Sequence, residues 1–476
     1  MDIVEGYFVC MKTTQLLPQI EKQEFPSFVY TYPSPRSYVN IADFSIDSLI
    51  FRDELAYTDN LNLYIHIPFC EQKCTFCPYL TLTNPKESFQ DEYIDAVINE
   101  LEMYQNIIES KNIVTINFGG GTPSLLTEKQ FEKIIRKLKQ INTHIDKTLL
   151  ELSIETTPET VSYKKFSGFK NMGLTRVSMG VESLIDEEIF LANRNNKQKD
   201  VENAIEILKK IEIQNICCDL MYGIEGQTIK SWKESVQNIL AYMPTTLELF
   251  ALTTRDHTAL GKREKKREKN SKEIEHSLLK SLLKKTESSK RTEETAVFLM
   301  SNSEKYDCYV LARNMLEEKE YAYSNHVFSL LRGGYLQQNN IFSGQSLLGF
   351  GVGARSYAKN MHVRNTYDIH AMKATKEYMQ KIKKNIRPIE TGFLFNKEEK
   401  IRQYVIYHLE KINKKEFQNT FQENFETIFS SFKTDAITLD LAIDTKDSFI
   451  LTKKGLQYKD LLCHVLFSEE VSKKER

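Results

Sequence analysis

The sequence predicts an α/β fold built on a parallel sheet, because strand-like and helix-like segments alternate along its first half. Six runs are rich in apolar and β-branched residues and end at glycine, proline or charged positions. The segments between them carry apolar residues at three- and four-residue spacing, with lysine and glutamate elsewhere, as crossover helices do. Parallel strands end at one common edge of a sheet, so we expect the functional loops there.

These elements follow one another in a regular order. The expected strands span residues 61–69, 113–124, 149–159, 175–183, 215–224 and 246–253. The expected crossover helices span residues 91–110, 128–141 and 200–213. The rhythm ends near Arg255, where a stretch of alternating basic and acidic residues begins. We expect that stretch to be an exposed helix or a solvated connector rather than a surface for nucleic acid.

The composition argues against several classes of partner. The chain of 476 residues has 64 Lys and Arg against 65 Asp and Glu, so no global field attracts nucleic acid or an anionic membrane. Nowhere do eighteen uncharged apolar residues run together, and the first stretch lacks the pattern of a secretory signal. Eight unevenly spaced cysteines do not suggest a disulfide framework. We therefore expect a cytoplasmic protein with no nucleic-acid or membrane partner.

Three of the cysteines lie in one short stretch directly after the first expected strand. Cys70, Cys74 and Cys77 have the spacing C-x3-C-x2-C. This spacing cannot lie on one helix face, so it predicts a loop wrapped around a metal group that all three thiolates bind. Three thiolates on a four-iron cluster leave one iron without a protein ligand. That open position distinguishes a cluster that binds a substrate from one that only carries electrons.

A structural zinc site is the main alternative for these cysteines, and it needs a fourth Cys or His at partner spacing. Cys217 and Cys218 are adjacent in an expected strand, where neighbouring side chains point to opposite faces, so we expect half-buried core thiols. His66 lies in the strand that precedes the loop. A packing or hydrogen-bonding role is favoured for it over a role as fourth ligand.

The sequence motifs that follow the cysteines resemble those of a known family. They are NFGGGTPS, ELSIETTPE, RVSMGVES and CDLMYGIEGQT. Together with the cysteine spacing, these motifs resemble those of the radical S-adenosylmethionine (SAM) superfamily. Within it they resemble the oxygen-independent coproporphyrinogen III oxidase family, whose distinctive motifs are YIHIPFC and GGGTPS. The resemblance extends from about residue 28 to the end and is strongest over 61–252. It implies a partial (β/α)6 barrel whose first loop carries a 4Fe-4S cluster.

The resemblance also implies a chemistry and a set of site residues. SAM would bind the open iron, and one electron would cleave its sulfonium to a 5′-deoxyadenosyl radical. Small residues let backbone groups approach the methionine moiety, while acidic, basic and hydroxyl side chains at successive strand ends contact the rest of SAM. The implied cofactor-binding positions are Tyr64, Gly119, Gly120, Gly121, Thr122, Glu155, Arg194 and Asp219.

One position departs from the family pattern. The family often has Gln in the GV-x-S word, where this chain has Glu182. A carboxylate carries a charge that an amide lacks, so we expect Glu182 to pair with Arg194 or to face a cationic group. It is counted among the SAM-binding positions.

Two further stretches bear on the substrate. VYTYPSPRSY, Val29 to Tyr38, resembles the Tyr-Pro word ahead of the barrel in the porphyrinogen oxidases and in related methylating and cyclopropanating enzymes. Tyrosine and arginine beside Pro-fixed backbone suit the walls of a site for a flat, unsaturated substrate, and a purely structural strap is the alternative. YAYSNHVFS and GFGVGARSY resemble words where the family's chain closes over the barrel mouth and a second SAM can bind.

These features favour a radical SAM enzyme that transfers a methyl group to, or cyclopropanates, an unsaturated carbon of a porphyrin-like or other planar substrate, using a second SAM. One alternative is an oxygen-independent coproporphyrinogen III oxidase-type oxidoreductase, although that enzyme continues with a C-G-C word where this chain has PYLT after Cys77. The other is a heme-binding chaperone with little turnover. A reductase or flavodoxin-type protein is the expected electron donor.

We expect four parts along the chain. Residues 1–55 form an N-terminal strap and residues 56–255 the radical SAM core barrel. Residues 256–386 contain the charged connector and a segment that closes the barrel. Residues 387–476 form a small, mainly helical C-terminal domain that includes a hairpin.

Overall fold

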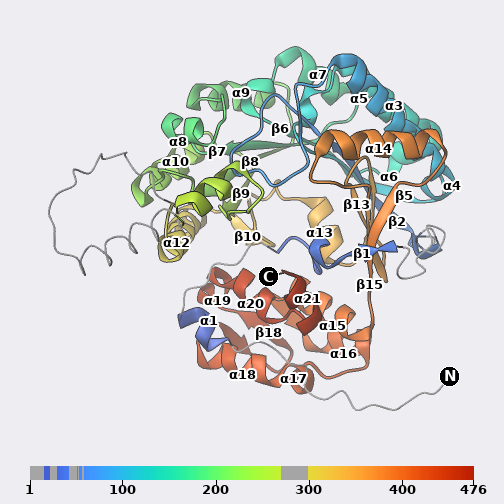
Figure 1. Cartoon of the computed structure of the whole chain (residues 1–476). Helices are drawn as coiled ribbons and strands as arrows, with labels where there is room; N and C mark the ends of the chain where they lie inside the picture. Colours follow the sequence, from blue (N-terminus) through green and yellow to red (C-terminus); the bar gives the residue numbers. More distant parts are fainter. Residues whose placement is uncertain are drawn as a thin grey trace, which may run out of the picture.

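The computed structural model describes residues 16–21, 29–41, 51, 53–55, 58–267, 269 and 299–475 of the chain. A single sheet of thirteen strands organises the larger part of it, in the order β1-β15-β14-β13-β12-β2-β5-β6-β7-β8-β9-β11-β10 (Figure 1). Its central strands are parallel from β12 to β9, with registers that step from each strand to the next. The parallel α/β core predicted from the sequence is confirmed.

The six expected strands are all present. Their bounds are β2 (Asn60–Ile67), β5 (Asn112–Gly120), β6 (Glu151–Thr156), β7 (Arg176–Glu182), β8 (Asn215–Tyr222) and β9 (Thr246–Ala251). The main crossover helices are α3 (Glu87–Met103), α5 (Glu128–Ile141), α7 (Tyr163–Asn171), α9 (Gln198–Lys210) and α10 (Ile229–Ala241). They cover the outer face of the curved sheet (Figure 1).

Helix α5 shows why these segments fold as they do. Thr127 caps its first turn, since the Gln130 N–H donates to the Thr127 hydroxyl at 3.2 Å and the Gln130 amide accepts from the Thr127 N–H at 2.9 Å. One face of the helix is buried, and Phe131 packs between Phe118 of β5 and Phe169 of α7, with ring centroids 4.7 and 4.4 Å away. The apolar layer between sheet and helices thus holds each crossover in place.

Short elements connect the larger ones in this half of the chain. They are α1 (Leu17–Glu21), η1 (Pro35–Ser37), β1 (Val39–Asn40), β3 (Phe69–Cys70), β4 (Leu82–Thr83), α4 (Gln105–Ile108), η3 (Pro123–Leu125), α6 (Ile145–Thr148), η4 (Pro158–Thr160) and α8 (Asp186–Leu191).

The segment after the connector extends the sheet at both edges. Its elements are α12 (Asn302–Glu318), β10 (Ala322–Ser324), β11 (Val327–Ser329), α13 (Leu336–Phe342), β12 (Ser346–Phe350), β13 (Arg355–Tyr357), β14 (Met361–Asn365), α14 (Ala371–Lys383) and β15 (Ile389–Leu394). Strands β11 and β10 add antiparallel pairs beyond β9, and β13, β14, β15 and β1 form an antiparallel extension beyond β12.

Helix α13 crosses the sheet at the amino ends of the parallel strands. Its Gln337 amide donates to the Leu63 carbonyl at 2.8 Å and to the Thr115 hydroxyl at 2.9 Å. Glu151 of β6 accepts from the N–H groups of Leu336 and Gln337 at the start of the helix. The helix therefore closes the end of the barrel opposite the cysteine loop.

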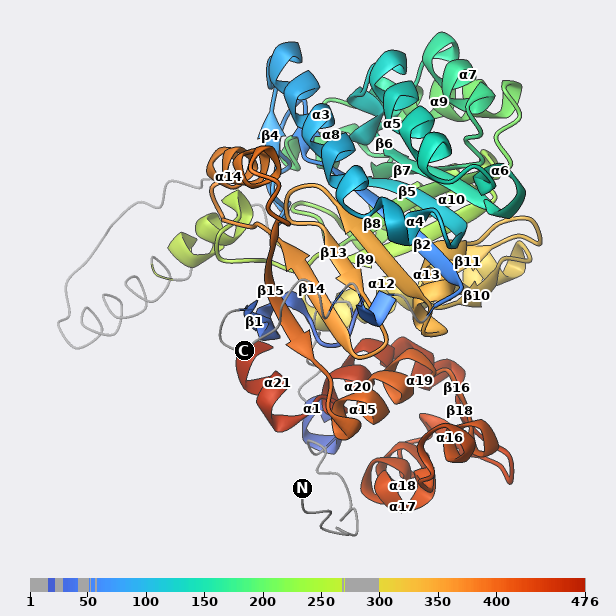
Figure 2. The same cartoon turned by 90° about the vertical axis from the view of Figure 1, so that its right-hand side faces the viewer.

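A second, smaller unit follows β15 and has its own apolar cluster. Its elements are α15 (Lys397–Tyr407), β16 (Lys411–Asn413), α16 (Lys414–Phe421), α17 (Phe425–Ile428), α18 (Ser430–Thr438), β17 (Ala442–Asp444), β18 (Ser448–Leu451), α19 (Lys453–Gln457), α20 (Lys459–Val465) and α21 (Glu469–Glu475). Figure 2 shows this unit in red beneath the sheet extension. Because β15 belongs to the large sheet, the first element of this unit is α15.

Residues 29–38 of the strap join the two units. Tyr32 has no accessible surface, and its hydroxyl is hydrogen bonded to Glu399 of α15 and accepts from the Ser468 N–H at 3.2 Å. Tyr30 lies near Phe250 of β9, with 6.1 Å between ring centroids.

Much of the expected strap, and the charged connector from residue 270 to 298, lie outside the described residues. Among those described, no helix is long and apolar enough to cross a bilayer.

Glu100 of α3 links the sheet extension to the barrel from a fully buried position. Its carboxylate accepts from the Tyr378 hydroxyl at 2.6 Å, the Gly351 N–H at 2.8 Å and the Asn365 amide at 2.7 Å. Tyr378 belongs to α14, which packs beside α3 (Figure 2). Burial raises the pKa of Glu100 to about 7, despite these three donors.

This raised pKa predicts a pH-dependent stability. Between the ordinary glutamate pKa of about 4.3 and about 7, the folded protein binds a proton at Glu100 that the unfolded chain releases, so stability falls as pH rises through this window. The free energy of unfolding of the native protein should fall by about 3 kcal/mol from pH 5 to pH 8 relative to that of Glu100→Gln. Urea titrations of both proteins across this range measure it. A difference that stays constant with pH would contradict the prediction.

Candidate functional site

The cysteine loop begins where β2 ends and is tied to its neighbours by backbone hydrogen bonds. Cys70 lies on β3, which pairs with β4, and the Cys77 N–H donates to the Cys74 carbonyl at 3.2 Å. The Thr75 N–H donates to the carbonyl of Ala192, in the loop after α8, at 3.0 Å. All three cysteine residues are partly buried. They therefore lie at the carboxyl edge of the sheet, where the sequence placed the functional loops.

The end of β5 approaches this loop more closely than any side chain would permit. The Gly121 N–H donates to the Ile67 carbonyl at 2.8 Å, and the Thr122 N–H donates to the Phe69 carbonyl at 2.6 Å. A Cβ atom on Gly121 would lie 2.5 Å from the Phe69 oxygen and 3.0 Å from the Cys70 sulfur. The Thr122 hydroxyl donates to the same sulfur at 3.5 Å. Glycine is thus required where β5 meets the first cysteine.

The two preceding glycines face β2 and β6. A Cβ atom on Gly119 would lie 2.6 Å from the Glu155 carboxylate and 2.7 Å from the Tyr64 ring. Gly120 has φ +121°, and its N–H donates to Glu155 at 3.0 Å. The Tyr64 hydroxyl is hydrogen bonded to His66 Nδ1 at 3.1 Å, so His66 has the hydrogen-bonding role that was favoured for it.

Arg194 connects the loop after α8 to β7 and to the cysteine loop. Its guanidinium donates to the Gly180 carbonyl, to Asn196 at 3.0 Å, to Glu182 at 3.3 Å and to the Cys74 sulfur at 3.6 Å. Glu182 has φ +64°, a strained conformation that turns the chain after β7. The ion pair between Glu182 and Arg194 is one of the two outcomes expected from the sequence, and it is almost completely buried.

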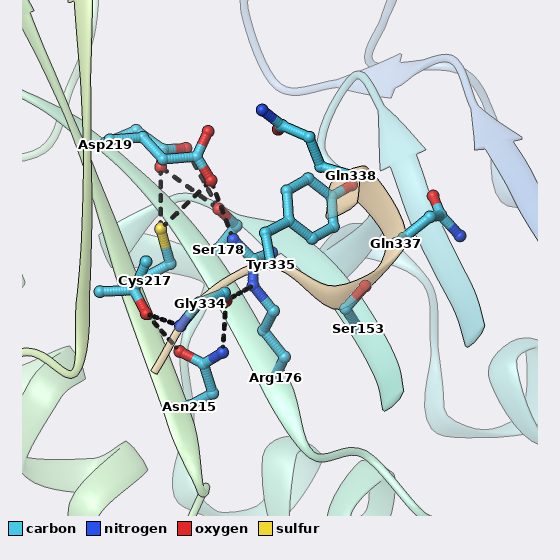
Figure 3. Close-up of polar contacts among 12 residues, drawn as sticks. Ser153, Arg176, Ser178, Asn215, Cys217, Asp219, Gly334, Tyr335, Gln337 and Gln338 are labelled. Atoms are coloured by element: carbon cyan, nitrogen blue, oxygen red, sulfur yellow. Dashed lines mark hydrogen bonds and ion pairs between the residues drawn. The ribbon is translucent and has the colours of Figure 1, made fainter. Parts of the chain in front are cut away.

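Asp219 lies deeper in the barrel, on β8 (Figure 3). Its carboxylate accepts from the Ser178 hydroxyl at 3.2 and 3.3 Å and from the Cys217 thiol at 3.4 Å. Cys217 and Cys218 are both fully buried rather than half-buried. Cys217 faces the polar interior of the barrel, whereas Cys218 lies in the apolar layer beneath the helices.

Reasoning from the sequence missed a charged network next to Asp219. Arg176 of β7 pairs with Glu248 of β9 at 3.0 Å, and its guanidinium lies 4.1 Å from the ring centroid of Tyr335 (Figure 3). The carbonyl of Gly334 accepts from Arg176 at 3.3 Å and from the Asn215 amide at 2.7 Å. The sequence did contain a signal for this network. Polar residues recur at every second position of β6 to β9, whereas a strand buried on both faces is apolar at almost every position.

Burial controls the charges inside the barrel. It raises the pKa of Glu155 to about 7, and it raises the pKa of Asp219 well above its ordinary value, with the nearby carboxylate of Glu248 adding to the effect. The pKa of Glu248 is raised for the same reason, although Arg176 opposes the shift. Several carboxyl groups therefore converge on a poorly solvated space with one arginine among them, an arrangement typical of a ligand site.

The loop offers three cysteine ligands, one fewer than a structural zinc site requires. Tetrahedral zinc with Zn–S bonds of about 2.3 Å holds its sulfur atoms about 4 Å apart. In the described part of the chain, only Cys217, Asp219 and Glu248 form a group of three possible ligands whose atoms all lie within 4.8 Å of one another. The three loop thiols do not belong to this group. Their binding of iron stays a prediction.

The predicted cofactor-binding positions converge at the carboxyl edge of the sheet. Thr122, Glu155 and Glu182 lie at or near the ends of successive strands. Tyr64 and Asp219 each lie three residues before the end of their strand, and Arg194 reaches the site from the loop before α9. Contact of these residues with SAM stays a prediction.

The chain is similar to known proteins along most of its length. Residues 64–239 match the model of the Radical SAM superfamily. The heme chaperone HemW of Buchnera aphidicola from Schizaphis graminum is 34% identical over 198 residues, which cover 42% of this chain and 52% of that protein. The matched segment thus spans about half of that relative. HemW of Bacillus subtilis is 26% identical over 405 residues, covering 82% of this chain and 95% of the relative.

A coproporphyrinogen oxidase is similar as well. The oxygen-independent coproporphyrinogen III oxidase of Salmonella typhimurium is 29% identical over 227 residues, 46% of this chain and 49% of that enzyme. The solved structure of the Escherichia coli coproporphyrinogen III oxidase HemN superposes with a TM-score of 0.75 at 18% identity, covering 96% and 99% of the two chains. The fold and the resemblance predicted from the sequence are confirmed.

Arg194 allows a sharp test of the predicted cofactor positions. Arg194→Ala should weaken SAM binding about 10- to 100-fold, because charge-assisted hydrogen bonds contribute about 1.5–3 kcal/mol each. Iron content after anaerobic reconstitution should stay unchanged. Equilibrium binding of SAM and iron analysis measure the two effects. Arg194→Lys is the matched control, which keeps the charge but loses the planar fork. Loss of iron in both variants would instead make Arg194 a residue that holds Cys74 and the loop.

Proposed function

We propose that this protein binds a 4Fe-4S cluster and SAM at the barrel mouth and acts on a tetrapyrrole. Residues 64–239 match the model of the Radical SAM superfamily, and the chain is similar to HemW heme chaperones and to the coproporphyrinogen oxidase HemN. The observation that carries the proposal is the convergence of the three loop thiols, the glycine edge of β5 and Arg194 at one end of the barrel. When bound and reduced, the cluster held by Cys70, Cys74 and Cys77 would supply the electron that cleaves the sulfonium of SAM.

The residues of the chain have distinct tasks in this proposal. Gly119 to Gly121 expose backbone groups to the methionine moiety, and Glu155, once ionised, accepts from its ammonium group or from a ribose hydroxyl. Asp219 accepts from the ribose in the same way. Helix α13, with Tyr335 and Gln337, seals the opposite end of the barrel, so water does not reach a reactive species from below.

The similarities favour tetrapyrrole chemistry of the HemW and HemN type over the methyl transfer or cyclopropanation predicted from the sequence. No similarity reported above supports a methyl acceptor, so we do not retain methyl transfer as the proposed reaction. An oxidoreductase acting on a porphyrinogen is the activity that we propose. A reductase or flavodoxin-type donor would supply the electron.

A heme chaperone with little turnover is the second candidate. The full-length similarity to the B. subtilis HemW favours it, as does Pro78, which follows Cys77 where the oxidases continue toward a further cysteine. The two candidates share the cluster and differ in whether SAM is consumed when the tetrapyrrole binds.

One experiment separates these candidates. The reconstituted protein is incubated without oxygen with SAM and a strong reductant, with and without coproporphyrinogen III or heme, and 5′-deoxyadenosine and S-adenosylhomocysteine are measured by mass spectrometry. We expect 5′-deoxyadenosine that increases with coproporphyrinogen III and no S-adenosylhomocysteine. Heme binding without 5′-deoxyadenosine would establish the chaperone instead, and S-adenosylhomocysteine would restore methyl transfer.

The cysteine variants test the cluster itself. Cys70→Ala, Cys74→Ala and Cys77→Ala should each lose bound iron and the brown absorbance of the cluster, and with them SAM cleavage. Cys463→Ala, a change of a buried thiol in the C-terminal unit, is the matched control and should retain both. Full SAM cleavage by any loop variant would refute the proposed function.

A further inference from the structure

Two arginines without acidic partners face each other in the sheet extension. Arg355 of β13 stands directly opposite Arg364 of β14 in the antiparallel pair. Residues in such a pair have Cβ atoms about 4.5–5.5 Å apart on the same face, and like charges there are destabilising. Among the described residues, neither guanidinium is hydrogen bonded or ion-paired to a carboxylate. Because this pair of like charges destabilises the sheet, its presence indicates a role other than stabilising the sheet.

The acidic group that acts on Arg364 is engaged elsewhere. Glu390 interacts electrostatically with Arg364, but its carboxylate accepts from the Tyr367 N–H at 3.0 Å and lies 3.7 Å from the Lys381 ammonium. The guanidinium of Arg364 instead lies 4.3 Å from the ring centroid of Tyr367. Neither arginine is therefore neutralised within the described protein.

Polar atoms without partners collect on the same face of the extension. Tyr357 follows Arg355 by two residues and is paired with His362, while Thr391 is paired with Arg364, so these side chains share the face of the two arginines. The buried atoms without a hydrogen-bond partner in the described structure include Tyr38 Oη, His362 Nδ1, Arg364 Nε and Thr391 Oγ1. His362 is 3% exposed and Tyr38 8% exposed. Buried polar groups ordinarily have partners, so this cluster indicates a ligand that supplies acceptors.

This face adjoins the barrel mouth. Arg355 interacts electrostatically with Tyr38 of the strap, with Tyr79 of the cysteine loop and with Tyr64 of the proposed SAM site. Tyr79 is 51% exposed. A ligand held by the arginines would therefore extend from the strap toward the cysteine loop, and tyrosine rings would line its path.

We propose that Arg355 and Arg364, with the Tyr38 hydroxyl, bind a carboxylate side chain of the substrate and so select a tetrapyrrole with free acidic side chains over a neutral one. The inference rests on the proposed function and deepens it. Each guanidinium can donate two parallel hydrogen bonds to a carboxylate, and one bound anion removes the repulsion between the pair. The carboxylate of a SAM molecule has the same chemistry, and the experiment separates the two sources.

The test measures binding by the reconstituted protein of coproporphyrin III, which has four carboxylates, and of its tetramethyl ester, which has none. Arg355→Gln and Arg364→Gln should each raise the Kd of coproporphyrin III about 10- to 100-fold and leave the Kd of the ester unchanged. Arg387→Gln is the matched control, because Arg387 also lies over a tyrosine ring, 5.3 Å from the centroid of Tyr104. It should bind both porphyrins as the native protein does.

Two further readouts keep the result interpretable. Removal of one of two repelling charges should leave the Tm of the ligand-free protein unchanged or higher, whereas a purely structural arginine would lower it. The Kd of SAM should be unchanged in both variants. An equal loss of affinity for acid and ester, an unchanged Kd for the acid, or a loss confined to SAM would each overturn the inference.

The outcomes also separate this inference from the proposed function. If the native protein fails to cleave SAM but Arg355→Gln still weakens the binding of coproporphyrin III alone, the carboxylate site stands and the proposed oxidoreductase activity falls. If SAM is cleaved and the native protein binds acid and ester equally, the reverse holds.

Discussion

The close approach of β5 to the cysteine loop is the contact on which the rest of the site depends. Two backbone hydrogen bonds, from Gly121 to Ile67 and from Thr122 to Phe69, join the two segments. They form only because Gly121 lacks a side chain at a point where a Cβ atom would overlap the Phe69 oxygen. The same contact brings the Thr122 hydroxyl to Cys70 and sets the distance between the first thiol and the glycine edge. A shift of this edge would separate the cysteines proposed to bind the cluster from the positions proposed to hold SAM.

The barrel interior is polar, and its stability depends on complete pairing. A buried charge is costly unless an opposite charge or hydrogen bonds compensate it. Arg176 offsets Glu248, and helix α13 supplies the tyrosine and amide groups that complete the contacts at the amino ends of the strands. Glu155 accepts from the Gly120 N–H beside the glycine edge, where a ligand would compensate its charge.

The sheet extension provides the second half of the binding surface. Glu100 joins α3, α14 and the turn after β12 through three hydrogen bonds, and this fixes β13 and β14 beside the barrel mouth. The strap then lies across the extension and packs Tyr32 into the C-terminal unit. The C-terminal unit thus stabilises residues 29–38 beside the barrel mouth, although none of the cysteines proposed to bind the cluster belongs to it.

Local patterns in the sequence determined the parallel core, the cysteine loop and the glycine edge. These features depend only on residues that are neighbours in the chain: the strand and helix periodicity, the C-x3-C-x2-C spacing and the triple glycine. They can therefore be recognised from the sequence alone. The ion pair of Arg194 with Glu182 was predictable because their chemistry is complementary. Tertiary structure alone decided that Arg176 meets Glu248 and Tyr335, which are far from it in sequence, because sheet register and helix packing set those distances. The register of the adjacent strands β13 and β14 decided that Arg355 stands opposite Arg364. The sequence patterns used above do not specify strand register. The network around Arg176 and the pair of Arg355 and Arg364 were therefore found only in the folded chain.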